Sequence, residues 1–232
     1  MQTKPRIIEF EGVAGCGKST LCGELKQELE NKGFRTWFLN EKPFSSFFYG
    51  YKWFHLHRYF QTFSLKALAR SVKLMCGLKC FGEIKRIKQL YDADVIYAYI
   101  IKHQPPNTIV LCDQSIIQTI VSLWGYNKEK VFSKKEEKAI SEYLSGSLLT
   151  EGFFCYLPIE ENLKRIRKRA RNHGRLNLVD DDEVLLRMLN NNLTNLRNVI
   201  SIKESTGAKE YFLSMHCEPK ELAESVMVQI GL

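Results

Sequence analysis

The sequence predicts an α/β protein in which one parallel β-sheet carries helices on both faces. Short runs rich in β-branched and aromatic residues alternate along the chain with segments of helical pattern. Neighbouring parallel strands need long crossover connections, and the intervening segments are long enough to form them. With 232 residues, 44% of them hydrophobic, the chain can bury one substantial core.

The elements follow in a regular order. A helical pattern directly after the first strand extends to Gly33, and the longest excursion, from Phe44 to His103, is mostly helical and closes at Pro105 and Pro106. We expect this excursion to determine specificity. Five strands are predicted, at Arg6–Glu11, Arg35–Leu39, Thr108–Cys112, Gly152–Leu157 and Lys209–Leu213.

The composition indicates in which cellular compartment the protein is found. No apolar run approaches the roughly 20 residues of a membrane-spanning helix, and the first residues lack a signal-peptide layout. We therefore expect a cytoplasmic protein without a transmembrane segment. The seven cysteines are odd in number, which favours reduced thiols. Cys76 and Cys80 form a C-x₃-C without a second pair nearby, which indicates helix packing more than a zinc site.

The charge is strongly basic. A formal net charge of +8 implies anionic partners, which are nucleotides, nucleic acid or an acidic membrane surface. The excess gathers in two clusters. Between Phe44 and Leu90 nine Lys and Arg stand against one acid, and between Lys164 and Arg175 there are seven Lys and Arg and no acid.

The clearest motif is a glycine-rich loop between the first strand and the first helix. Its spacing is G-x-x-x-x-G-K-S, in which backbone N–H groups can surround a phosphate at the helix N-terminus. Lys18 would reach the β and γ phosphates of ATP, and the Ser19 hydroxyl would ligate Mg²⁺. The alternative is a tight turn with a solvated lysine. The predicted ATP-binding residues are Gly12, Val13, Ala14, Gly15, Cys16, Gly17, Lys18, Ser19 and Thr20.

An acid follows the third strand. Asp113 stands at the carboxyl end of an apolar strand, where open α/β sheets bind ligands, and it suits a carboxylate that helps hold Mg²⁺. The alternative is an N-cap of the helix that begins near Ser115. A switch GTPase is disfavoured, because the nearest match to N-K-x-D, at Asn127 to Lys130, ends in lysine.

Two further segments supply charged groups at the same edge. The second strand leads into Glu41 and Lys42: a carboxylate there can accept a proton from an attacking hydroxyl, and an ammonium can hold an acceptor phosphate. After the fourth strand, Arg165 and Arg169 are four residues apart and would share a helix face, and Arg175 follows a glycine. Such an arginine-rich segment can close over a transferring phosphate. Solvated loop charges and a nucleic-acid footprint are the alternatives.

The segment from Phe44 to Phe63 holds ten aromatic residues in twenty, interleaved with basic residues. It can pack in a helical subdomain, stack a base, form the interface of a homodimer, or lie on an anionic membrane. His55 and His57 are two residues apart and would not share a helix face, which disfavours a metal site.

Four segments together resemble the thymidylate kinase and deoxynucleoside kinase group of P-loop kinases: "FEGVAGCGKST", "LNEKP", "LCDQS" and "LPIEENLKRIRKR", in that order over most of the chain. The resemblance implies a P-loop NTPase three-layer sandwich with strand order 2-3-1-4-5, which transfers the γ-phosphoryl group of Mg-ATP to a nucleoside or a nucleoside monophosphate such as dTMP. We expect one domain over 1–232, with a helical acceptor region at 44–103 and an arginine-rich lid at 164–182. The resemblance assigns catalysis to Lys18, Glu41, Asp113, Arg165 and Arg169, and ATP contact to Arg175.

Two positions depart from the pattern of the group, both on the acceptor side. Gln114 stands where the group has arginine, and Lys42 intervenes between Glu41 and the proline. Gln114 can form hydrogen bonds but cannot neutralise a phosphate. Gln114 and the aromatic segment also suit a kinase of another hydroxyl substrate, such as a saccharide or a membrane-associated molecule. The net charge and the two basic clusters suit a third alternative, an ATP-binding regulatory or nucleic-acid-binding protein.

Overall fold

The computed structural model describes residues 4–38, 65–114, 116–124, 126, 128–146, 151–169 and 175–232. These residues form a five-stranded, entirely parallel sheet with strand order β2-β3-β1-β4-β5. The predicted fold class and strand order are therefore confirmed. The strands are β1 (Arg6–Glu11), β2 (Arg35–Phe38), β3 (Thr108–Cys112), β4 (Glu151–Tyr156) and β5 (Glu210–Ser214).

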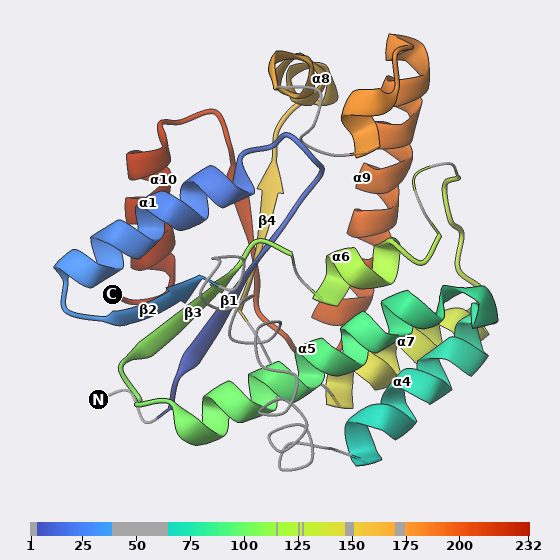
Figure 1. Ribbon diagram of the computed structural model, residues 1–232, viewed down its shortest axis with the longest axis horizontal. Helices are drawn as coiled ribbons and strands as arrows, with labels where there is room; N and C mark the ends of the chain where they lie inside the picture. The colour runs from blue at the N-terminus through green and yellow to red at the C-terminus, as the bar shows by residue number, and fades with distance from the viewer. Residues whose placement is uncertain are drawn as a thin grey trace.

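Helices cover both faces of the sheet (Figure 1). One face carries α1 (Lys18–Asn31) and α10 (Pro219–Gln229), which pack on each other. The other face carries α5 (Ile84–His103), α6 (Ile116–Val121) and α9 (Asp182–Glu204). Outside these lie α4 (Leu65–Leu78) and α7 (Lys134–Gly146), which pack on each other; α4 also contacts α5, and α7 contacts α9. The short segments are η1 (Phe81–Glu83), α8 (Ile159–Lys168) and η2 (Arg175–Leu178).

Alternation along β1 divides the interior into two cores. Successive side chains of a strand point to opposite faces, so Ile8 and Phe10 pack with α1 and α10, while Ile7 faces the core under α5, α6 and α9. Glu9 and Glu11 point to that second face and are almost fully buried. Two acids in the central strand are unusual, since carboxylates are rarely buried unless they are paired.

Local sequence explains where the longest helix begins. Asp181 precedes α9 with extended backbone, and its carboxylate accepts hydrogen bonds from the backbone N–H groups of Glu183 (2.8 Å) and Val184 (3.1 Å). Two otherwise unpaired donors of the first turn are thereby satisfied. The helix then runs across the sheet and brings its last turn to the buried acids of β1.

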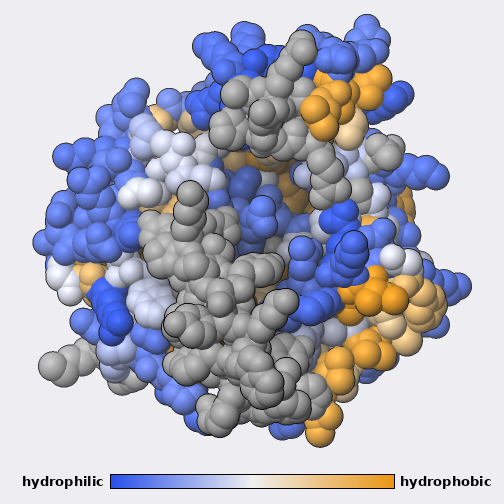
Figure 2. Space-filling view, in the orientation of Figure 1, coloured by the Kyte–Doolittle hydropathy of each residue, from blue (hydrophilic) through white to orange (hydrophobic). Residues whose placement is uncertain are grey.

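Where the structure describes it, the excursion before β3 is helical except at Lys79 and Cys80, which join α4 to η1. Residues 39–64, which include the whole aromatic segment from Phe44 to Phe63, lie outside the described residues. Figure 2 shows apolar side chains gathered over α4 and the start of α5; the exposed ones are Leu65, Leu68, Val72, Phe81 and Ile84. Within the described ranges, no helix has the length and apolar character needed to cross a membrane.

Candidate phosphate-binding site

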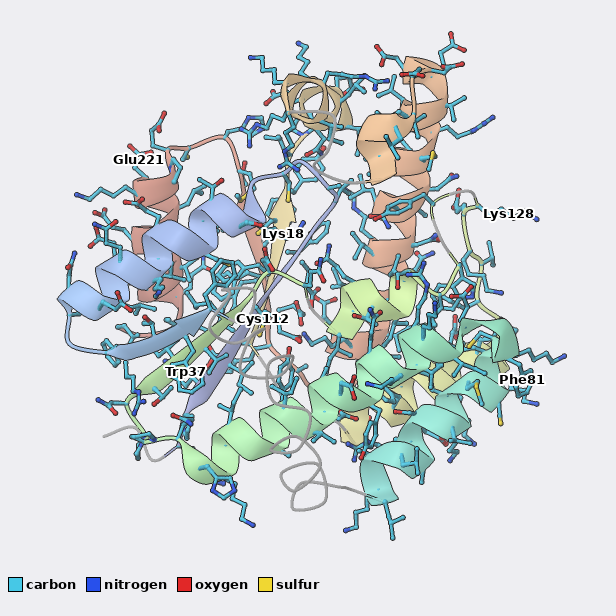
Figure 3. All side chains as sticks on the ribbon, in the orientation of Figure 1. Lys18, Trp37, Phe81, Cys112, Lys128 and Glu221 are labelled. Atoms are coloured by element: carbon cyan, nitrogen blue, oxygen red, sulfur yellow. The ribbon has the colours of Figure 1, made fainter. Side chains whose placement is uncertain are left out.

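The glycine-rich loop joins β1 to α1 at the carboxyl edge of the sheet. Lys18 is the first residue of α1, and Figure 3 shows it at the start of that helix, close to the ends of the central strands. The parallel strands all end at this edge, so the loop, the end of β3 and the start of α8 meet there. This is the edge at which open parallel α/β sheets bind ligands.

Two of the loop glycines are required by close packing. Gly12 has φ +152°, and a Cβ there would collide with the backbone oxygen of Cys155 on β4. Gly15 has φ +91°, and its Cβ would lie 2.9 Å from the backbone oxygen of Asn162 on α8. A side chain at either position would therefore push the loop away from β4 or α8. The compact loop exists because the chain has glycine at these points.

The Lys18 ammonium is held by the loop itself. Its Nζ donates to the carbonyl oxygens of Gly12 (2.7 Å) and Val13 (3.2 Å). Gln118 on α6 also donates to the Gly12 oxygen, from Nε2 at 2.8 Å. The ammonium therefore lies against the carbonyl oxygens of the loop. Gln118 is a part of this arrangement that the sequence reasoning missed.

Ser19 and Asp113 meet across the site. The Ser19 hydroxyl donates to Oδ2 of Asp113 at 2.5 Å, although the two residues are 94 positions apart in the chain. Asp113 is buried, with 7% of its surface exposed. The sequence placed each of them separately at this edge as a residue for Mg²⁺, and the fold brings them together.

The donors that meet here suit magnesium. Mg²⁺ prefers oxygen ligands and is usually held by one or two carboxylates together with substrate phosphates and water, and a hydroxyl beside a carboxylate provides such a set. In the described part of the chain no group of three or more His, Cys, Asp or Glu side chains could form a protein-only metal cage. Cys76 and Cys80 have no further ligand in that part, so the structure gives the weak zinc signal no support.

Arg165 reaches the loop from α8. Its Nη1 donates to the carbonyl oxygen of Cys16 at 3.2 Å, and its Nη2 donates to that of Met215 at 3.5 Å. Arg167 points elsewhere: it bonds the carbonyl oxygens of Val179 and Asp180 at the approach to α9. Arg165 is therefore the arginine of α8 that bonds the glycine-rich loop.

Arg169 lies at the end of the helix that carries Arg165. Helix α8 ends at Lys168, and Arg169 is its C-cap, with φ −76° and ψ 150°. The predicted helical face of the two arginines therefore reaches only as far as this cap, and the function of Arg169 in a lid stays a prediction. Arg169 is exposed.

Other predicted residues are not tested. Glu41 and Lys42 lie outside the described residues, as does the side chain of Arg175, so their roles stay predictions. Gln114 is exposed and directly follows Asp113.

The cysteines near the site are thiols. All seven cysteines of the chain are free. Burial raises the pKa of the Cys22, Cys112 and Cys155 thiols well above the ordinary value. A buried, protonated thiol is a poor nucleophile, so these side chains serve as small core residues.

Comparison with known proteins adds evidence about the fold. No protein-family model matches the chain, and no curated protein matches it. Among solved structures, it is similar to the deoxyadenosine kinase from M. mycoides, determined with bound dATP. The two share 17% sequence identity with a TM-score of 0.52, over 97% of this chain and 100% of that one. The phosphate loop, the sheet order and this similarity together show that the chain has the fold of the P-loop deoxynucleoside kinases.

Proposed function

We propose that the protein is an ATP-dependent phosphotransferase that transfers the γ-phosphoryl group of ATP to a nucleoside or a nucleoside monophosphate. One observation carries the proposal: the hydrogen bond between Ser19 and Asp113 beside the Lys18 loop. A glycine turn with a merely solvated lysine would not require a buried acid from β3 to face the residue after that lysine.

Each residue at the loop has a function in this proposal. The N–H groups of the loop and the start of α1 surround the phosphates of ATP, and the Lys18 ammonium moves from the loop carbonyls to them. Arg165, already against the loop, neutralises charge that develops as the γ-phosphoryl group moves. Ser19 and Asp113 would hold Mg²⁺, which would supply positive charge to neutralise the phosphates of ATP. Transfer of the γ-phosphoryl group is direct and in line. Positioning of the reactants and neutralisation of their charge supply most of the catalysis.

Fewer observations support the proposal for the acceptor. The solved neighbour is named a deoxyadenosine kinase, which makes deoxynucleosides the first acceptors to test. Glu41 is the proposed proton acceptor for the attacking hydroxyl, as the resemblance implies. Gln114, exposed at the end of β3, would contact the acceptor through neutral hydrogen bonds, which suits an uncharged nucleoside more than a monophosphate.

An acceptor screen tests the proposal. The protein is incubated with Mg-ATP and a panel of deoxynucleosides, ribonucleosides, nucleoside monophosphates and simple sugars, and products are identified by mass. A phosphorylated nucleoside or nucleotide is expected with the wild type and not with Lys18→Ala. Lys32→Ala, an exposed lysine just past the end of α1, is the matched control and should retain full activity.

Other outcomes contradict the proposal in distinct ways. A phosphorylated sugar as the only product would identify a kinase of a different hydroxyl substrate. Salt-sensitive binding to DNA or RNA without ATP turnover would favour the regulatory alternative, because contacts with phosphate backbones weaken as salt rises.

A further inference from the structure

A row of side chains crosses the sheet beneath α9. The strand register places Glu9 on β1, Gly152 on β4 and Glu210 on β5 side by side. Lys203, in the last turn of α9, reaches this row from above the sheet. Its ammonium lies 3.6 Å from Oε2 of Glu9 and 3.2 Å from Oε1 of Glu11, and it contacts the Glu210 carboxylate.

The cluster is sealed from solvent. The exposed fraction of the side chain is 6% for Lys203, 1% for Glu9, 0% for Glu11 and 3% for Glu210. Gly152 makes the arrangement possible, because a Cβ at that position would overlap the Glu210 carboxylate. The missing side chain in the middle of the row therefore leaves room for the acid from the neighbouring strand.

Charge in the cluster is unequal, with three carboxyl groups around one ammonium. Burial raises the pKa of Glu11 to about 8, and it raises the pKa of Glu210 as well. Burial alone would lower the pKa of Lys203, but the surrounding acids together outweigh it and raise that pKa, so the ammonium keeps its charge. A buried cation in this setting holds the acids in place, because removing it would leave buried like charges without compensation.

Glu9 connects this cluster to the phosphate site. While its Oε2 faces Lys203, its Oε1 accepts hydrogen bonds from the Tyr97 hydroxyl (2.7 Å) and from the backbone N–H of Ile116 (3.1 Å). Ile116 is the first residue of α6 and stands three positions after Asp113. One buried carboxylate thus joins α9, α5 and the start of α6.

We propose that Glu9 is a positioning residue for the phosphate site: the hydrogen bond that its Oε1 accepts from Ile116 fixes the first turn of α6 and thereby the place of Asp113 beside Ser19. The inference rests on the proposed function, because it assigns Asp113 a part in holding Mg²⁺. Residues that orient a metal-binding side chain in this way typically change metal affinity or activity by about 10- to 100-fold when they are replaced.

Two variants of similar size test the hydrogen bonding of Glu9 separately from its charge. Glu9→Gln loses the charge but keeps an oxygen that can accept from Tyr97 and Ile116, whereas Glu9→Leu removes both the charge and the acceptor. Arg6→Met is the matched control: it breaks another ion pair of β1, with Glu151, at the far end of the strand.

Two readouts are combined. The first is the Mg²⁺ concentration that gives half-maximal activity, and the second is amide hydrogen exchange in the segment that contains Asp113 and α6. With Glu9→Leu, the required Mg²⁺ should rise about 10-fold and exchange at the start of α6 should quicken, while the KM for the acceptor is unchanged. Glu9→Gln and Arg6→Met should match the wild type in both readouts.

A folded Glu9→Leu variant with normal Mg²⁺ dependence and normal exchange would overturn the inference. An equal rise in the required Mg²⁺ in Glu9→Gln and Glu9→Leu would also overturn it, because the charge of Glu9, and not its hydrogen bond to Ile116, would then be what matters. If Glu9→Leu does not fold, amide exchange is measured in the wild type alone. The Ile116 amide should then exchange as slowly as the amides in the core of β1. Exchange as fast as in an open loop would contradict the proposal. If the wild type phosphorylates no acceptor, the proposed function is refuted. The exchange measurement still tests whether the hydrogen bond between Glu9 and Ile116 holds the start of α6.

Discussion

Asp113 and Glu11 show how position decides what a carboxylate can do. Asp113 stands at the carboxyl edge of the sheet and accepts from a hydroxyl next to the phosphate loop. Glu11 lies only one residue before that loop, yet its side chain points under α9, where it is fully buried beside Lys203. Two acids close to one loop thus have separate functions: one faces the site and the other belongs to the interior.

Asp113→Asn should impair metal activation while leaving the fold intact. The amide oxygen can still accept from Ser19, but the negative charge that favours a cation is lost. We expect a roughly 10- to 100-fold fall in activity at low Mg²⁺, partly recovered as Mg²⁺ is raised. The measurement is turnover against Mg²⁺ concentration, with Asp92→Asn on the surface of α5 as control. Unchanged Mg²⁺ dependence would show that Asp113 does not help to hold the metal.

Glu11→Gln should change how stability depends on pH. The folded-state pKa of Glu11 is raised by burial to about 8, against 4.5 as the ordinary value. Between these values the folded protein holds a proton that the unfolded chain releases, so stability falls as pH rises through this window. The slope contributed is at most about 1.4 kcal/mol per pH unit. Urea denaturation from pH 5 to pH 8 should show a shallower fall in Glu11→Gln than in the wild type.

A suitable control for that series is Glu221→Gln, on an exposed position of α10. It should retain the slope of the wild type. Identical slopes in Glu11→Gln and the wild type would mean that Glu11 is ionised in the folded protein at neutral pH.

At the residue scale the sequence predicted the contacts that lie within one motif. The spacing from Gly12 to Ser19 was sufficient, because the loop is built from consecutive residues. Gln118 and Glu9 were missed, since their hydrogen bonds depend on which strands and helices become neighbours. The one available signal was the pair of acids alternating within the apolar first strand, a pattern that indicates buried partners on one face.

Among elements, the strands were easier to predict than the ends of helices. Each predicted strand agrees with the structure to within about one residue where the structure describes it, because glycine, proline and polar residues bound the apolar runs. The end of α8 was not predicted: its basic residues continue past Lys168, so nothing in their pattern marks the stop. Arg165 and Arg167 of that helix nevertheless form hydrogen bonds with different parts of the chain.

Arg165→Met and Arg167→Met should give opposite results. Arg165 bonds the Cys16 oxygen at the phosphate loop, so its loss should lower kcat by roughly 100-fold with little change in Tm. Arg167 pairs with Asp182 and bonds two carbonyl oxygens before α9, so its loss should leave kcat nearly unchanged. Because the Arg167–Asp182 pair is largely exposed, we expect it to contribute no more than about 1 kcal/mol. Steady-state kinetics and thermal melts of both variants make the comparison; equal kcat values would contradict the assignment of Arg165.

For the molecule as a whole, the alternation of strands and helices predicted a parallel sheet, and the resemblance to the kinase group implied its strand order. The carboxyl edge of such a sheet is where Ser19 and Asp113 meet. The acceptor did not follow from the sequence. In the proposed function it would be recognised by shape and hydrogen bonding, and no fixed spacing of residues encodes such contacts.

Binding of ATP should stabilise the entire fold through the loop. A ligand that binds only the folded protein adds RT ln(1 + [L]/Kd), or about 2.7 kcal/mol at one hundred times Kd. We expect Tm to rise with ATP concentration in the wild type and hardly at all in Lys18→Ala, measured by differential scanning fluorimetry. Equal increases in both proteins would place ATP somewhere other than the glycine loop.

The shared carbonyl of Gly12 has a consequence for the energetics of binding. Both Lys18 and Gln118 donate to that oxygen. In the proposed function, an arriving phosphate draws the ammonium away, and a buried acceptor left alone would carry a desolvation penalty. Gln118 keeps the oxygen satisfied, so the lysine can exchange partners while the backbone stays where it is. The loop is in this sense preorganised: nucleotide affinity need not offset the cost of rebuilding it.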